Sequence, residues 1–158
     1  MRSNYLKVYM HFVWATWDRQ PIIDPHRQTV IIQSIRNEAS RWKVKIHALG
    51  GVDNHIHLLI QLPSTIGYGQ LVNQLKGKSS KLCGPAFRWQ RTYAAISVSK
   101  RDVAMVVKYI ENQEQHHALG PLLSSLEITE SGRAGESFCS LEPRLQAQGL
   151  QTSGAGLP

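Results

Sequence analysis

An apolar run from His55 to Leu62 that carries two histidines constrains this chain more than any other segment. Turn-forming residues precede the run and Pro63 follows it, so its length and boundaries are those of a β-strand. Side chains on a strand alternate between two faces, so His55 and His57 project from one face while Ile56 points into the core. Two imidazoles roughly 7 Å apart on one face can bind a divalent metal. Two ordinary polar residues on a solvated face would give the same pattern.

The order of the other hydrophobic patterns predicts an α+β domain. Strand patterns cover residues 6–14, 44–48, 55–62 and 92–99, and helical patterns cover about 25–42, 68–83 and 100–118. The expected order is therefore β-α-β-β-α-β-α. A split βαβ repeat of this kind forms an antiparallel sheet with the helices on one face, which is the ferredoxin-like arrangement.

The composition changes after Gly120-Pro121. Residues 1–120 hold all the periodic patterns and are long enough for one domain with its own core. Residues 121–158 are rich in Ser, Gly, Glu and Gln and show little periodicity. We therefore expect a mostly disordered, low-complexity tail, which carries no recognisable chemistry.

The charge of the chain favours a polyanionic partner. There are 18 Lys and Arg against 11 Asp and Glu, a formal net charge of +7, and the positive surplus lies before the tail. Nucleic acid is the commonest partner of such a surface, although a positive surplus can also serve solubility alone. The sequence has no signal-peptide pattern, no apolar run of the about 20 residues that a membrane span needs, and only two cysteines. We expect a soluble cytoplasmic protein with reduced thiols.

The third predicted helix carries a tyrosine and a glutamine on one face. Tyr109 and Gln113 are four residues apart, and Tyr109 falls on the flank of the apolar stripe, where a tyrosine is usually a packing residue. Together with His55 and His57, the Gln113 amide oxygen would complete a three-ligand site for Mg²⁺ or Mn²⁺. Tyr109 would then lie near the phosphorus of a bound phosphodiester. Its pKa of about 10 makes the phenol a weak nucleophile, so it would depend on a cation at the phosphate oxygens.

Several segments match one family in order and spacing. They are Val13–Arg19, Asp53–Ile60, Leu75–Ser80, Trp89–Tyr93, Ser97–Ser99 and Tyr109–His117. Over about residues 5–118 the chain resembles the HUH-type single-tyrosine transposases of small bacterial insertion sequences, a group that includes the repeat-associated (REP) tyrosine transposases. The tail after His117 is not part of this resemblance.

The resemblance implies a specific activity. Enzymes of this group act on single-stranded or hairpin DNA at element ends, form a covalent 5′-phosphotyrosine and release a 3′-hydroxyl that later rejoins strands. By the match, Tyr109 is the nucleophile, and His55, His57 and Gln113 are the metal ligands. The resemblance also implies a homodimer in which the tyrosine helix can serve the metal of either subunit.

Basic and aromatic side chains near the second and third helices predict contacts with DNA. The predicted contact residues are Lys76, Lys78, Lys81, Arg88, Trp89, Arg91 and Lys108. Cations of this kind bind the phosphate backbone, and Trp89 and Trp17 are expected to stack on unpaired bases. Ordinary solvated lysines and a core tryptophan are the alternatives. For His11 and His47 we expect packing or surface roles; the alternative is that one of them helps to position the site.

Three other functions fit the same residues. The first is a catalytically inactive or domesticated protein that binds hairpin or repeat DNA. The second is another HUH enzyme, a replication initiator or relaxase, but these commonly carry a second tyrosine or a third histidine. The third is a metal-dependent hydrolase that uses a metal-bound water, with Tyr109 in a structural role.

Overall fold

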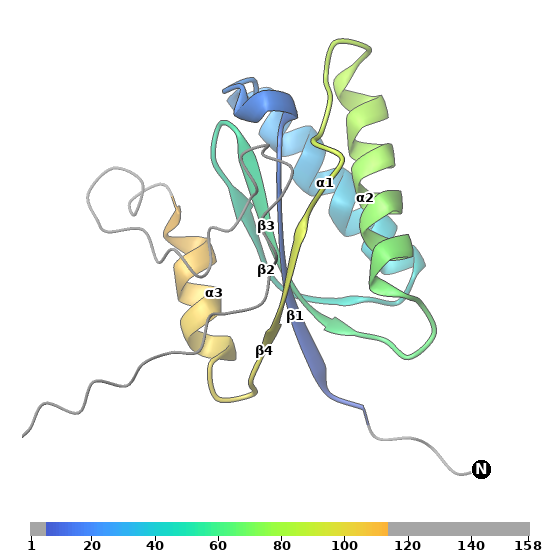
Figure 1. The fold of residues 1–158 in the computed structure, drawn as a ribbon, viewed down its shortest axis with the longest axis vertical. Coiled ribbons are helices and arrows are strands. Elements are labelled where there is room, and N and C mark those ends of the chain that lie inside the picture. The colour runs from blue at the N-terminus through green and yellow to red at the C-terminus, as the bar shows by residue number, and fades with distance from the viewer. Residues whose placement is uncertain (1–5, 114–158) are drawn as a thin grey trace, which may run out of the picture.

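A computed structural model of the protein describes residues 6–113, so the predicted tail and the end of the third predicted helix lie outside the described residues. Four antiparallel strands form one sheet in the order β2-β3-β1-β4, and three α-helices and one short 3₁₀ helix connect or follow them (Figure 1). The strands are β1 (Val8–Ala15), β2 (Lys45–Gly51), β3 (His55–Leu62) and β4 (Ala94–Val98). The helices are η1 (Trp17–Arg19), α1 (Pro25–Arg41), α2 (Tyr68–Cys83) and α3 (Val103–Glu111). The predicted α+β, ferredoxin-like order is confirmed.

The ends of two helices follow from local side-chain chemistry. Asp24 caps α1, because its carboxylate accepts a hydrogen bond from the backbone N–H of Arg27 at 2.7 Å, and this bond lowers the pKa of Asp24. Helix α3 begins three residues later than the sequence pattern predicts. Residues 99–102 form a turn instead, in which the Asp102 N–H donates to the Ser99 carbonyl at 3.0 Å and the Ser99 hydroxyl donates to the Asp102 carboxylate at 2.7 Å.

The main core lies between the sheet and the pair α1 and α2, which pack against each other (Figure 1). Large apolar side chains from the two interior strands and from both helices are fully buried there. They include Phe12, Trp14, Ile56, Leu58, Ile60, Ile31, Ile35, Leu71 and Leu75. Each such side chain stabilises the fold by about 1.5–3 kcal/mol relative to exposure, so this layer fixes the position of β3.

Helix α3 covers the opposite face of the sheet (Figure 1). Its side chains Val106, Tyr109 and Ile110 pack against Ala48 of β2 and Leu59 of β3 in a second buried cluster. The expectation that the helices share one face therefore holds only for α1 and α2. The physical reason is that β3 is an interior strand with apolar residues on both sides, so both of its faces need cover.

Gly50 allows α3 to lie close to the sheet. A Cβ atom added at Gly50 would be 2.8 Å from the backbone carbonyl oxygen of Ile110, which is shorter than any ordinary contact. Only glycine therefore fits between β2 and the end of α3. Within residues 6–113, the structure contains no helix that is both long and apolar enough to cross a membrane.

Candidate metal and tyrosine site

Two buried imidazoles lie side by side on the α3 side of the sheet. His55 and His57 are 1% and 0% exposed, and their ring centroids are 4.9 Å apart at an interplanar angle of 71°. They pair in register with Ala15 and Val13 of β1, both buried. The alternation of β3 therefore places both histidines on one face, with Ile56 in the main core on the other.

Each of these histidines has its Nδ1 atom engaged by a neighbouring side chain. His55 Nδ1 lies 2.6 Å from Oδ1 of Asn54, and His57 Nδ1 lies 2.9 Å from Nε2 of His11. In both rings Nε2 is therefore the nitrogen that would bind a metal ion, with its orientation set by the contact at Nδ1.

Tyr109 lies directly beside this pair. The centroid of its ring is 5.7 Å from that of His57, at an interplanar angle of 80°. The sequence places Tyr109 on the flank of α3, but the side chain is only 4% exposed because it packs against Ala48 and Leu59. Gln113, one helical turn later, is 2% exposed. The fold thus places the predicted nucleophile Tyr109 beside the predicted ligand His57 within one subunit.

The donor chemistry fits a metal whose third ligand is an amide. Among residues 6–113, no group of three His, Cys, Asp or Glu side chains is arranged to hold a metal ion. His55 and His57 would need another kind of donor, and the amide oxygen of Gln113 is of the right type for Mn²⁺ or Mg²⁺. All three donors are neutral, so a bound cation would keep its charge for anionic phosphate.

A basic groove lies near the same end of the sheet. It has a volume of about 460 Å³ and is lined by residues that include Trp17, Gly77, Ser80, Arg88 and Arg91. Trp17 is 50% exposed, and both arginines are exposed. Proteins that bind single-stranded nucleic acids commonly combine an aromatic ring with neighbouring cations in this way.

Backbone hydrogen bonds connect this groove to the histidine pair. Thr16 forms a β-bridge with Trp89, and its N–H donates to the carbonyl of Asn54 at 2.9 Å. Asn54 contacts His55, as described above, and Trp17 donates its N–H to the Arg88 carbonyl at 2.9 Å. Hydrogen bonds between three backbone segments, around residues 16–17, 54–55 and 88–89, therefore link the groove to the histidine pair.

Two of the predicted DNA contacts are buried. Lys76 is 8% exposed, and its ammonium donates to the carbonyl oxygens of Gln90, Arg91 and Thr92 at 2.6, 3.3 and 3.1 Å. Burial lowers the pKa of Lys76 to about 8. Trp89 is 8% exposed in the main core, where its indole N–H donates to the Ser79 hydroxyl at 3.0 Å. Both side chains hold the segment before β4 against α2, rather than pointing to solvent as the sequence suggests.

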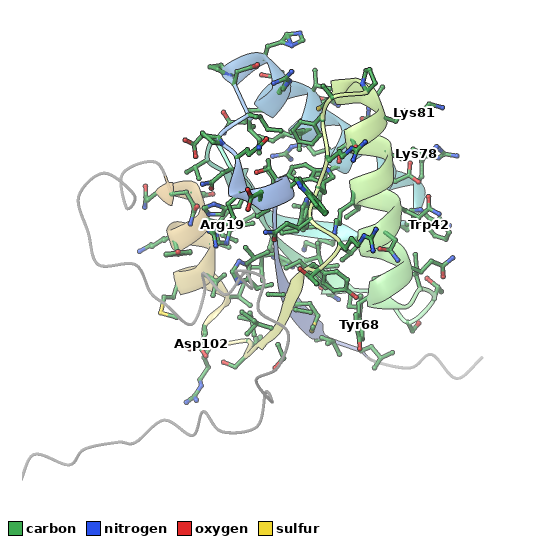
Figure 2. The ribbon with its side chains drawn as sticks, turned by 45° about the horizontal axis from the view of Figure 1, so that its top comes forward. Arg19, Trp42, Tyr68, Lys78, Lys81 and Asp102 are labelled. Carbon is green, nitrogen blue, oxygen red and sulfur yellow. The ribbon has the colours of Figure 1, made fainter. Side chains whose placement is uncertain are left out.

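The other predicted contacts are exposed but lie on different surfaces. Lys78 and Lys81 project outward from α2 (Figure 2). Lys81 shares a second groove, of about 480 Å³, with Arg88. Lys108 is exposed on α3, on the other face of the sheet. The structure thus gathers Lys81, Arg88 and Arg91 around two adjoining grooves and leaves Lys108 apart.

Sequence reasoning missed two residues of the site, His11 and Asn54. Asn54 is expected only in a turn, but its position immediately before His55 is the signal for a contact. His11 is expected in a packing or surface role, and the structure shows that it is 0% exposed and hydrogen-bonded to His57. Its signal is that it alternates with Phe12, so it lies on the same face of the sheet as His57 and is brought beside it by the pairing of β1 with β3.

Comparison with known proteins gives one consistent family. The family described as Transposase IS200 like matches residues 4–113, which include all of the described chain. The transposases for insertion sequence element IS200 from Salmonella typhimurium (strain LT2) and Salmonella typhi are each 29% identical over 127 residues. Each match covers 72% of this chain and 82% of the relative.

Two solved structures share the fold. A chain from Deinococcus radiodurans R1 is 25% identical, with a TM-score of 0.57, and the match covers 72% of this chain and 95% of that one. A REP-associated tyrosine transposase bound to a REP hairpin is 18% identical, with a TM-score of 0.61 and coverage of 74% and 73%. The similarity to this second structure shows only that the two proteins share a fold.

Proposed function

This chain belongs to the IS200-like transposase family, and from that premise we propose that it cleaves and rejoins single-stranded DNA with Tyr109 as the nucleophile. The observation that carries the proposal is the contact between the rings of Tyr109 and His57, 5.7 Å between centroids. A structural tyrosine on α3 has no need of two buried histidines beside it, whereas a nucleophile for phosphodiesters needs a charge-stabilising group there.

The proposed reaction is a transesterification at phosphorus. The phenolic oxygen of Tyr109 forms a bond to the phosphorus as the bond from phosphorus to the 3′ oxygen breaks. The phenol gives up its proton, and the leaving oxygen takes one up to become a 3′-hydroxyl. Attack of a 3′-hydroxyl on the resulting 5′-phosphotyrosine reverses the step and joins strands, so the reaction needs no ATP.

His55, His57 and Gln113 are the residues that would hold a divalent cation, Mg²⁺ or Mn²⁺. When bound, the cation would neutralise charge on the phosphate oxygens and lower the barrier to attack by a neutral phenol. The protein itself supplies rigidity, because both imidazoles are on an interior strand and each has a partner at Nδ1. Pre-oriented ligands of this kind bind without rearrangement.

DNA must uncover Tyr109 before the reaction. The side chain is 4% exposed, whereas an attacking oxygen must come within about 3–3.5 Å of phosphorus. The second cluster that holds α3 to the sheet is small compared with the main core. A transient opening between α3 and the sheet is therefore the least costly movement that admits a phosphodiester, and α3 must return to its packed position for Tyr109 to attack beside His57.

The groove beside Trp17 is the proposed path of the unpaired strand. Arg88 and Arg91 would bind successive phosphates, Trp17 would stack on a base, and Lys81 would extend the contact over the adjoining groove. Lys78 and Lys108 are proposed as weaker, peripheral contacts because they lie on other surfaces. Lys76 and Trp89 would act indirectly, by fixing the segment that carries both arginines.

We also propose that the protein is a homodimer that binds hairpin or repeat DNA at element ends. The support is the family resemblance, together with the presence of the REP-associated relative on a REP hairpin. Light scattering after size exclusion tests the dimer directly. A monomer at micromolar concentration, with and without DNA, would contradict it.

The burial of Tyr109 favours a second candidate, a protein that binds such DNA without cutting it. In that case α3 never leaves the sheet. Binding would survive in every variant of the tyrosine, and no covalent product would form under any condition.

One experiment separates the two candidates. Single-stranded DNA from the flanks of the gene, labelled at either end, is incubated with protein and Mg²⁺ or Mn²⁺, and covalent products are resolved on a denaturing gel. We expect a product that retains the DNA 3′ of the cut, that disappears with Tyr109→Phe and His57→Ala, and that persists with Tyr68→Phe. Tyr68 is the matched control because it is 51% exposed on α2, far from the sheet face of the histidines. DNA that forms a retarded complex but no covalent product would favour the binding protein. Cleavage that persists in Tyr109→Phe would indicate a hydrolase.

A further inference from the structure

His11 is a buried imidazole that the proposed reaction does not use directly. It lies in the middle of β1, is 0% exposed, and shares the α3 side of the sheet with His57. Its Nε2 atom is 2.9 Å from Nδ1 of His57, and the planes of the two rings are nearly parallel, at 14°, with centroids 5.1 Å apart. Burial of an imidazole in the centre of a sheet costs free energy unless its nitrogens are hydrogen-bonded.

We propose that His11 is a positioning residue, which fixes the tautomer and the orientation of His57 and so directs Nε2 of His57 toward the metal. This inference rests on the proposed metal site. A neutral histidine that binds a metal through Nε2 keeps its proton on Nδ1. That N–H then donates to Nε2 of His11, whose own proton is on its Nδ1.

The two metal ligands would then be supported in parallel ways. Asn54 Oδ1, at 2.6 Å, accepts the Nδ1 proton of His55, and His11 Nε2 accepts that of His57. Such outer contacts fix ring orientation and raise the basicity of the ligand. His11 is not itself the third ligand, since within the described part of the chain no three His, Cys, Asp or Glu residues form a metal-binding group.

An imidazole suits this position better than the more usual carboxylate. The position is fully buried, and a carboxylate there would introduce a charge that only the metal could balance. With His11 as the acceptor, every side chain that contacts or would ligate the cation is neutral. The cation then keeps its full charge for the DNA phosphate, which is the group that the reaction must stabilise.

The test measures metal binding and histidine tautomers without any DNA. Calorimetric titration with Mn²⁺ compares the wild type with His11→Leu, which removes the acceptor at similar volume, and His11→Gln, whose amide oxygen can replace it. We expect His11→Leu to weaken Mn²⁺ binding by about 10- to 100-fold and His11→Gln to restore most of the affinity. His47→Gln is the matched control, because His47 is a half-buried histidine of β2 that contacts Tyr9 instead, and it should leave the affinity unchanged.

Two results distinguish failure of this inference from failure of the proposed site. If the wild type and His57→Ala bind Mn²⁺ equally poorly, the metal site itself is wrong. If His57→Ala abolishes binding but a folded His11→Leu binds within threefold of the wild type, the role of His11 is wrong. If His11→Leu does not fold, nitrogen-15 spectra of the Mg²⁺-loaded wild type show which nitrogen of His57 carries the proton. A proton on Nδ1 supports the inference. A proton on Nε2 overturns it.

Discussion

Replacing Gly50 with alanine should move α3 away from the sheet and separate Tyr109 from His57. The new Cβ atom would lie 2.8 Å from the Ile110 carbonyl oxygen and 3.2 Å from the Ile110 Cγ2 atom. The oxygen belongs to the backbone of α3, so no side-chain rotation relieves the contact. The helix end must move by about 0.6 Å to reach the 3.4 Å at which van der Waals contacts become ordinary.

This displacement should lower the free energy of unfolding, and it should have a larger effect on the rate of covalent attachment to DNA. Overpacking of this kind typically destabilises a protein by about 1–3 kcal/mol, which lowers the melting temperature of a domain of about 100 residues by roughly 4–20 °C. Tyr109 immediately precedes Ile110, and a misplacement of about 1 Å can slow a positioned reaction by about 100-fold. We therefore expect covalent attachment to DNA to slow by about tenfold.

Gly67→Ala is the matched control for this prediction. Gly67 is the exposed N-cap residue of α2, and a Cβ atom there would have no neighbour within 4 Å. Alanine is a poorer N-cap than glycine and should destabilise the protein by about 0.5–1 kcal/mol, but it should leave the attachment rate unchanged. Thermal unfolding and single-turnover attachment assays are compared for the three proteins.

The reasoning is refuted if Gly50→Ala melts at or above the wild-type temperature and attaches DNA at the same rate. Such a result would mean that α3 does not lie against β2 as described. A large loss of stability with an unchanged rate, measured well below the melting temperature, would instead show that the reactive position of α3 differs from its packed one.

Three further predictions concern the groove and the segment beside it. Burial holds the pKa of Lys76 at about 8, against an ordinary value of 10.5. Between these two pH values the unfolded chain therefore binds more protons than the folded protein. The free energy of unfolding should accordingly rise as the pH increases from about 8 to 10. Lys76→Met should lose this rise. If urea titrations of the variant show a rise of equal size, the pH dependence does not come from Lys76. Arg88→Gln and Arg91→Gln should each reduce the slope of log affinity for single-stranded DNA against log salt by about 0.7, whereas Arg36→Gln on the outer face of α1 should not change it. Trp17→Ala should weaken that binding about tenfold through lost stacking while the melting temperature stays within about 2 °C, and unchanged affinity in a filter-binding assay would exclude Trp17 from the DNA path.

Local patterns in the sequence were sufficient to predict most of the secondary structure. The bounds of β3 and α2 agree with the apolar run and the helical spacing, because Pro63 and Gly84 end these elements through backbone chemistry. The common face of His55 and His57 follows from strand alternation alone. These features depend on neighbours in the chain, which a sequence displays directly.

The remaining features depend on contacts between distant residues. Whether α3 packs beside α1 or on the opposite face is decided by which strands are interior, and the pattern of one helix cannot show this. The same holds for Lys76, whose position in α2 resembles that of a solvated lysine until the carbonyls of Gln90 to Thr92 are placed beside it. His11 lies 46 residues from His57, so only the pairing of β1 with β3 brings the two rings together.

The register between β1 and β3 determines both the position of the two histidines and the packing of the main core. In this pairing Val13 faces His57 and Trp14 faces Ile56. A slip of one residue in β3 would turn both imidazoles into the main core and turn Ile56 and Leu58 toward the α3 side of the sheet. A misaligned pairing of β1 with β3 therefore cannot retain the proposed metal site, so the step that closes the main core also places the two histidines.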